Sequence, residues 1–184
     1  MFQAVSILAL IVSSLVAKGN ACVVPTGIND GGGIEFSSLT FPPPPAGIFG
    51  TCIGTAVPTL GEYETPIQMR MTLAAVTGVY GAASAFEENA LEWLGRVDVS
   101  EDRRRCANSP WFQEHRAVTL AYAVMWHMVQ FVPNSKDNLL AEALSWNLDL
   151  NICDTQDCSD ISTPWGLARA MLEEATEIFA VDGW

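Results

Sequence analysis

The stretch AVTLAYAVMWHMVQFV, residues 117 to 132, decides the fold of this chain because it contains no Lys, Arg, Asp or Glu. Its apolar residues recur at helical spacing on more than one side, and a helix that is apolar all round is buried all round. The run includes His127 and Gln130 and is shorter than the ~20 residues of a membrane span. We therefore predict a buried helix from about Phe112 to Val132 at the centre of a soluble bundle.

A further helix follows this one after a short connection. Pro133 cannot continue the central helix, and Ser135 can cap a new helix from Lys136 to about Leu150. The residues expected on its inner face are Leu140, Ala143, Leu144 and Leu148. Two helices joined by so few residues should pack antiparallel as a hairpin.

Before the central helix, residues 67 to 95 show the periodicity of a helix rich in small side chains. The small residues form one stripe, which consists of Ala75, Gly78, Ala82 and Ala85. Glycine inside a helix costs ~1 kcal/mol relative to alanine, so we expect the stripe to be there for the close approach of another helix. Residues 96 to 110 are predicted to form a charged loop.

The last helix has clear boundaries in the sequence. Thr163 is expected as its cap, Pro164 as its first residue and Gly183 as the residue just past its end. Its expected inner stripe consists of Leu167, Ala168, Met171, Leu172, Ala175, Ile178 and Phe179, opposite Glu173, Glu174 and Glu177. The pattern has no strand alternation of convincing length. We therefore predict an all-α fold, with a bundle of about four main helices in residues 67 to 184.

The first part of the chain differs from the bundle. Residues 1 to 21 resemble a secretory signal peptide, with an apolar run from Ala4 to Ala17 and small residues at the end; a signal anchor is the alternative. Residues 22 to 66 contain runs of glycine and proline, including Pro42 to Pro45. We predict an irregular Gly/Pro-rich arm here, a stiff connector rather than a polyproline ligand.

The chain is strongly acidic, with 9 Lys and Arg against 21 Asp and Glu and a formal net charge of -12 at pH 7. Its basic cluster, Arg103 to Arg105, follows Glu101 and Asp102, and three consecutive side chains point in different directions. An acidic surface repels the phosphates of nucleic acids and anionic lipids. We expect no nucleic-acid partner and no membrane association after signal cleavage.

All five cysteines lie after the predicted signal peptide, which fits a secreted or secretory-pathway protein. Cys153 and Cys158 are the expected disulfide pair because they are close enough to link one loop. Pairing of Cys22 with Cys52 or Cys106 is a looser prediction. None of the spacings is CxxC, so neither a zinc site nor a redox pair is indicated.

The two histidines are the first candidates for proton transfer near neutral pH. His115 and His127 would lie ~18 Å apart along one helix, too far to share a metal or a proton. No second ligand or nucleophile lies at a helical offset from His127, so we expect it to be a core residue hydrogen-bonded to a neighbour. We expect His115 at the surface or at the helix end.

The loop before the last helix is rich in carboxylates and amides. The residues that could surround calcium are Asp149, Asn151, Asp154, Asp157 and Asp160. The loop lacks the central glycine and closing glutamate of an EF-hand, so we favour a solvated loop linked by the disulfide. The sequence also lacks a Gly-rich phosphate loop, GxSxG and HExxH. We therefore predict no catalytic, cofactor-binding or metal-binding residue.

Three segments together resemble the amino-terminal half of vanadium-dependent haloperoxidases. They are MRMTLAAVTGVYGAASAF (residues 69 to 86), HRAVTLAYAVMWHMVQFVPNSKDNLLAEAL (115 to 144) and TPWGLARAMLEEATEIFAVDGW (163 to 184). The resemblance implies an all-helical fold shared with type 2 phosphatidic-acid phosphatases, and oxidation of halides by hydrogen peroxide on bound vanadate. In that family a Lys, two Arg, a Ser-Gly pair and two His bind vanadate, on motifs downstream of the matched segments. This chain has none of those motifs.

Two functions follow as hypotheses. The chain is either the scaffold half of a secreted haloperoxidase-like protein, cut at the join to a C-terminal helical half and inactive alone, or a free-standing secreted helical interaction module. A fragment of an acid-phosphatase-like relative is a third hypothesis with the same fold. Four helices alone should leave apolar surface exposed, so we expect a homo-oligomer or packing against the missing half.

Overall fold

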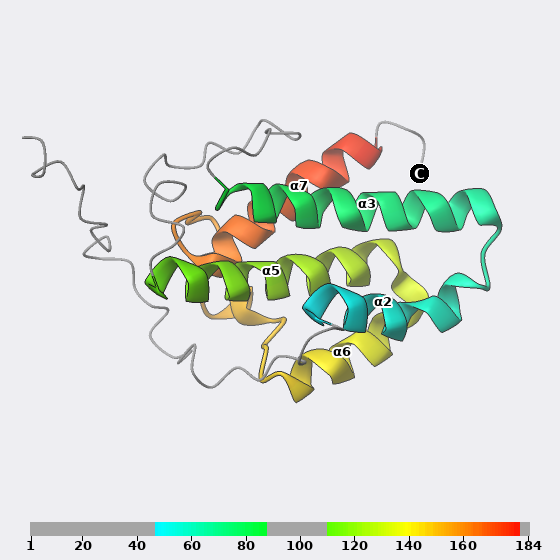
Figure 1. Ribbon diagram of the computed structural model, residues 1–184, viewed down its shortest axis with the longest axis horizontal. Helices are drawn as coiled ribbons and strands as arrows, with labels where there is room; N and C mark the ends of the chain where they lie inside the picture. Colours follow the sequence, from blue (N-terminus) through cyan, green and yellow to red (C-terminus); the bar gives the residue numbers. More distant parts are fainter. Residues whose placement is uncertain (1–46, 88–109, 181–184) are drawn as a thin grey trace, which may run out of the picture.

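A computed structural model describes residues 47–87 and 110–180, and this part of the chain is helical, without a β-strand. Its helices are α2 (Gly47–Leu60), α3 (Thr65–Ser84), α5 (Pro110–Phe131), α6 (Lys136–Ser145) and α7 (Pro164–Ala180), with 3-10 turns at Pro133–Ser135 and Ile152–Asp154 (Figure 1). The predicted all-α fold is confirmed. None of the helices in the described ranges is long and apolar enough to cross a membrane.

Several sequence predictions lie outside the described residues. They concern the signal peptide (1–21), residues 22–46 of the arm, residues 88–95 of the first predicted helix, the charged loop before residue 110 with its arginines 103–105, Cys22, Cys106 and Gly183. These remain predictions.

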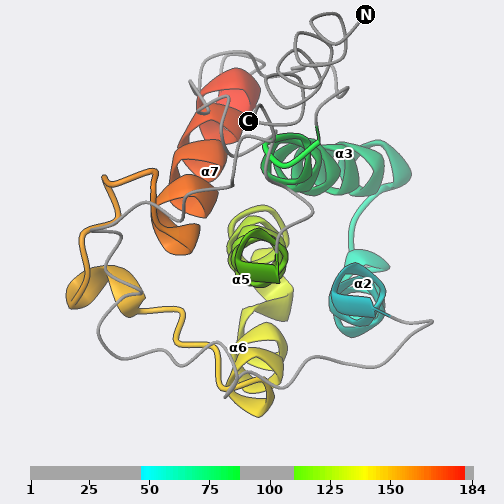
Figure 2. The same ribbon diagram turned by 60° about the vertical axis from the view of Figure 1, so that its left-hand side comes forward.

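Helix α5 runs through the middle of the bundle, as its uncharged sequence predicts. Figure 2 shows it nearly end-on at the centre, with α2, α3, α6 and α7 around it. Every residue from Ala121 to Met128 is buried, so this part of the helix has no face toward solvent. The uncharged run is thus buried on all sides over Ala121 to Met128, whereas toward its end Val129 is half-buried and Gln130 is exposed.

Helix α3 packs against both α5 and α7. The predicted stripe of small residues is confirmed, because Ala75, Gly78, Ala82 and Ala85 are all buried. The helix ends at Ser84, however, and does not continue toward residue 95 as predicted. Ser84 Oγ donates to the carbonyl of Gly81 at 2.8 Å, and the amides of Phe86 and Glu87 bond to carbonyls three residues back. These bonds tighten the last turn and end the helix.

Part of the predicted irregular arm is a helix, which corrects the sequence interpretation. Helix α2 forms although it contains interior glycines and Pro58. Cys52 and Ala56, four residues apart, are fully buried on the side of α2 that contacts α5 and α6. This tertiary packing outweighs the low helix propensity of glycine and proline.

Ser135 occupies the N-cap position of α6, as predicted, but its side chain makes no capping hydrogen bond. Its hydroxyl instead forms a hydrogen bond with the hydroxyl of Thr59 and lies 3.4 Å from the carbonyl oxygen of Ala56. The residue therefore links α2 to the turn between α5 and α6.

Helix α6 turns back beneath α5 and completes the predicted hairpin (Figure 1). It ends at Ser145, earlier than the predicted Leu150, because Asn147 adopts the left-handed conformation with φ 57°. The amide of Leu148 then donates to the carbonyl of Ala143 at 2.9 Å, which is the Schellman arrangement that terminates helices. Leu144, predicted to face inward, is 73% exposed, which corrects that prediction.

Helix α7 begins as predicted, with Pro164 as its first residue. The hydroxyl of Thr163 accepts a hydrogen bond from the amide of Gly166 at 3.0 Å, which is the expected N-cap contact. The inner stripe is buried apart from Ile178, which is half-buried. Glu174 is buried too, against the prediction that it faces outward. Since α7 packs on both α3 and α5, its buried arc is wider than one stripe.

Candidate functional site

His127 lies where three helices meet. Its ring is buried on α5, touches Gly78 of α3 and lies near the backbone of Met171 of α7. Nδ1 is 2.6 Å from the carbonyl oxygen of Ala123, and because a carbonyl only accepts, Nδ1 carries the proton. Nε2 makes no hydrogen bond within the described residues. The prediction of a core histidine hydrogen-bonded to a neighbour is confirmed.

The contact between His127 and Gly78 is very close. A Cβ atom built on Gly78 would lie only 1.6 Å from Nε2 of His127. The glycine therefore admits an imidazole ring between α3 and α5, which is a more specific role than close approach of two backbones. Nε2 faces the backbone of α3 at this point and leaves no room for a ligand between them.

Burial lowers the pKa of His127 from 6.5 to about 4. The main cause is desolvation, because the charged imidazolium would lose its contact with water in the core. The carbonyls of Ala123 and Met171 favour the protonated form and offset part of this effect. The ring is therefore neutral at pH 7, and its contacts are those of a packing residue.

His115 is also buried, which corrects the prediction of a surface histidine. Its ring meets Phe86 edge-on, with ring centroids 5.7 Å apart. Beside it, Arg116 forms an ion pair with Glu87 at 2.7 Å. Both contacts join the start of α5 to the segment just after α3, so His115 belongs to the packing of these two helices.

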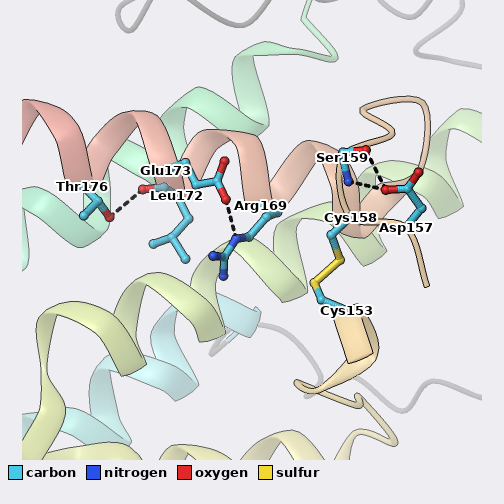
Figure 3. Close-up of polar contacts among 8 residues, drawn as sticks. All are labelled: Cys153, Asp157, Cys158, Ser159, Arg169, Leu172, Glu173 and Thr176. Carbon is cyan, nitrogen blue, oxygen red and sulfur yellow. Dashed lines mark hydrogen bonds and ion pairs between the residues drawn. A yellow bond between two sulfur atoms is a disulfide. The ribbon is translucent and has the colours of Figure 1, made fainter. Parts of the chain in front are cut away.

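The loop before α7 is held by the predicted disulfide between Cys153 and Cys158, which is confirmed with Cα atoms 5.4 Å apart (Figure 3). Nearby, the Asp157 carboxylate accepts hydrogen bonds from the amide of Ser159 at 2.8 Å and from its hydroxyl at 2.6 Å. These bonds favour the charged carboxylate and lower the pKa of Asp157. The carboxylate thus stabilises the turn that follows the disulfide.

Two other carboxylates of this loop, which was predicted to be solvated rather than to bind calcium, also form hydrogen bonds with nearby backbone amides. The Asp149 carboxylate accepts a hydrogen bond from the amide of Asn151 at 2.9 Å, and the Asp160 carboxylate accepts one from the amide of Ser162 at 2.9 Å. An aspartate that bonds the amide two residues on forms an Asx turn. Within the described ranges, no group of three His, Cys, Asp or Glu is placed to hold a metal ion. Asp149, Asp157 and Asp160 therefore serve the backbone of the loop.

Cys52 is a free thiol in the core, which corrects its predicted pairing with Cys22. Its Sγ lies 3.7 Å from Sδ of Met125. Burial, together with the charge of Glu142, raises the pKa of the Cys52 thiol to about 12. A thiol that stays protonated at neutral pH is a core residue and not a nucleophile.

The surface is hollowed beside the C-terminal end of α7. One hollow of about 390 Å³ lies between α3, the end of α5 and α7, and its apolar lining includes Ile67, Met71, Phe131 and Phe179. A larger hollow of about 680 Å³ lies along α3, and Phe179 lines both hollows.

Figure 3 shows Arg169 of α7 turned toward Glu173, with which it forms an ion pair at 2.8 Å.

The outward face of α3 carries an apolar row, which consists of the exposed Met69, Leu73 and Tyr80 and the half-buried Val76 and which we call the α3 stripe. Met69 is 70% exposed and Leu73 49%, and both line the larger hollow together with Val76. Their spacing places all four on one side of the helix. Contiguous apolar rows on a protein surface mark interaction sites more often than single exposed residues do.

No family model, curated protein or solved structure matches this chain. The resemblance to haloperoxidases therefore rests on the three sequence segments alone.

The sequence contains one signal for the α3 stripe, which is the scarcity of charge in this helix. Arg70 is the sole charged residue of α3, although the chain as a whole has a net charge of -12. A helix at the edge of a bundle normally carries several charges on its outer face. For the burial of His115 the pattern contains no comparable signal, since Phe86 is far away in the sequence.

Proposed function

We propose that this chain is the non-catalytic scaffold half of a secreted haloperoxidase-like protein and is inactive alone. One observation supports this role. The three segments that carry the resemblance correspond to α3, to α5 with α6, and to α7, and helices α3, α5 and α7 pack directly on one another (Figure 2). Three helices that share one core can hold a second helical half in a fixed position.

The vanadate of the family would have to bind elsewhere. An oxyanion of this kind needs several cationic and N–H donors that converge. Here Arg116 and Arg169 form ion pairs with Glu87 and Glu173, and both histidines are buried in helix packing. The remaining described cations, Arg70 on α3 and Lys136 at the start of α6, lie on different helices, so we assign no vanadate site and no reaction step to the described residues.

The natural transcript provides the first test of this proposal. If the chain is a scaffold half, the reading frame should continue past the codon for Trp184 and encode the Lys, Arg, Ser-Gly and His motifs of the vanadate site. A stop codon directly after Trp184 would contradict the proposal.

Calorimetric titration of the processed chain with vanadate provides a second test. We expect no saturable binding and no oxidation of bromide by hydrogen peroxide. Saturable binding would contradict the proposed division between scaffold and catalytic halves. A phosphatase-like relative would show the same continued frame, but the joined protein would hydrolyse phosphate esters.

A free-standing helical interaction module is the second proposed function. The α3 stripe favours it, because an exposed apolar row can bind a partner without any catalytic half. The two functions predict different transcripts, because a scaffold half requires a reading frame that continues past Trp184 and a free-standing module does not. In both cases we propose that a partner binds the outer surface of α3.

A further inference from the structure

We infer that the α3 stripe binds a single amphipathic helix that has apolar residues at heptad spacing and lysine or arginine on its flanks. The inference names the partner of the proposed scaffold and rests on that role.

The geometry of the stripe fits a helix. Successive members of Met69, Leu73, Val76 and Tyr80 are four, three and four residues apart, which is the spacing of the apolar seam in helix pairs. The row extends ~17 Å along α3, or about three turns. The hollow between α3 and Phe179 offers a groove into which the side chains of a partner helix can insert.

The size of the stripe argues against a second copy as the partner. The stripe consists of three partly exposed side chains and the half-buried Val76, which is a small patch for a protein surface. A stable protein dimer buries about 800 Å² on each partner. The stripe is thus large enough for one helix and too small for a stable dimer.

The acidic charge of the chain indicates which charges the partner helix should carry. The net charge of -12 makes two copies repel each other. Helix α3 itself has one charge, Arg70, whereas the exposed Glu62 and Glu64 lie just before its first turn. A partner helix with an apolar face would therefore be attracted to the acidic protein if its basic flank lies toward Glu62 and Glu64 and away from Arg70, which lines the hollow beside the stripe.

A designed peptide tests this inference. The probe is a fluorescent helical peptide of three heptads, with leucine at the seam positions and lysine at the flanking positions, and its binding to the full chain is followed by fluorescence anisotropy. We expect one-to-one binding that weakens at least 10-fold in the variant Met69→Gln with Leu73→Gln. Leu144→Gln removes an apolar side chain of α6 that is 73% exposed and lies outside the stripe, and it should leave binding unchanged.

Four results would overturn the inference. The first is equal binding of a control peptide with serine at the seam, which would mean that charge alone attracts the peptide. The second is equal binding of a peptide with glutamate on its flanks. The third is the failure of a hydrophobic dye to bind the full chain, which would show that another part of the chain covers the stripe. The fourth is a dimer at micromolar concentration that Leu73→Gln dissociates.

The outcomes also separate this inference from the haloperoxidase proposal. Peptide binding together with a stop codon after Trp184 would support the docking surface and contradict the scaffold half. A continued reading frame with the vanadate motifs, but no peptide binding, would contradict the docking surface alone.

Discussion

Gly78 lies in close contact with the His127 side chain of α5, and its replacement tests the packing of the core. In Gly78→Ala the new Cβ would lie 1.6 Å from Nε2 of His127, so the ring or the helix must move. Overpacking of this kind costs about 1–3 kcal/mol, which exceeds the ~1 kcal/mol that alanine gains over glycine in a helix. We expect a lower free energy of unfolding in urea.

Gly54→Ala is the matched control for this substitution. Gly54 lies inside α2, and a Cβ atom added there would meet no atom within 4 Å outside its own helix turn, so alanine should stabilise the protein by about 0.5–1 kcal/mol. The double variant Gly78→Ala, His127→Ala should lose less stability than the two single variants together, because the collision is absent. Equal effects of alanine at positions 54 and 78 would contradict the contact.

His127 should make the stability of the protein depend on pH. Its pKa is 6.5 in the unfolded chain and about 4 in the folded one, so the unfolded state takes up the proton first as the pH falls. The stability contributed by the neutral ring is complete above pH 6.5, declines between pH 6.5 and 4, and does not change below pH 4. The shift corresponds to a loss of roughly 3 kcal/mol.

The measurement is a comparison of the wild type with His127→Gln. Both proteins contain the same carboxylates, so the difference between their free energies of unfolding isolates His127. Relative to the variant, the free energy of unfolding of the wild type should fall by roughly 3 kcal/mol between pH 7 and pH 4. Parallel profiles for the two proteins would show that His127 is not buried as a neutral ring.

Among the elements, α7 depends on a single cap residue. The Thr163 hydroxyl accepts a hydrogen bond from the amide of Gly166 at 3.0 Å and donates one to the carbonyl of Asp160 at 2.8 Å. Thr163→Ala removes both bonds, and we expect a loss of about 1–2 kcal/mol in chemical unfolding followed by circular dichroism. Thr155→Ala, which removes one bond of 3.2 Å in an exposed turn, should change stability by less than about 0.5 kcal/mol. Equal losses would argue against the cap.

The elements that the sequence predicts well are those specified by their own residues. Helix α5 is marked by the lack of charge in residues 117–132, and α7 by Thr163 and Pro164 in front of a regular apolar stripe. The Cys153–Cys158 disulfide follows from their short separation. In each case the signal lies within the element, so a single sequence is enough.

The elements and residues that the sequence predicts poorly depend on contacts with distant parts of the chain. Helix α2 forms because its buried face packs on α5, where Cys52 meets Met125, although its glycines and proline indicate a loop. His115 is buried by Phe86. The outward turn of Leu144 follows from the packing of α6. Such tertiary contacts override local propensity and cannot be inferred from spacing alone.

In the whole molecule, two surface properties oppose each other. The net charge of -12 keeps copies of the chain apart, while the α3 stripe offers apolar surface that two copies could bury. The range of the charge repulsion is ~30 Å in 0.01 M salt and ~3 Å in 1 M salt. The salt concentration therefore determines which property dominates.

This opposition predicts a monomer in 0.01 M salt and weak self-association in 1 M salt, at concentrations above about 100 μM, by sedimentation equilibrium. A hydrophobic dye should bind at both salt concentrations, because the stripe is exposed in the monomer. Leu73→Gln should reduce both dye binding and association, whereas Leu144→Gln changes a residue of α6 outside the stripe and should have a smaller effect on both. A tight dimer in 0.01 M salt would contradict both the charge argument and the size of the stripe. A dye-free monomer would mean that the stripe is covered, and a scaffold that still awaits its partner could not have that property.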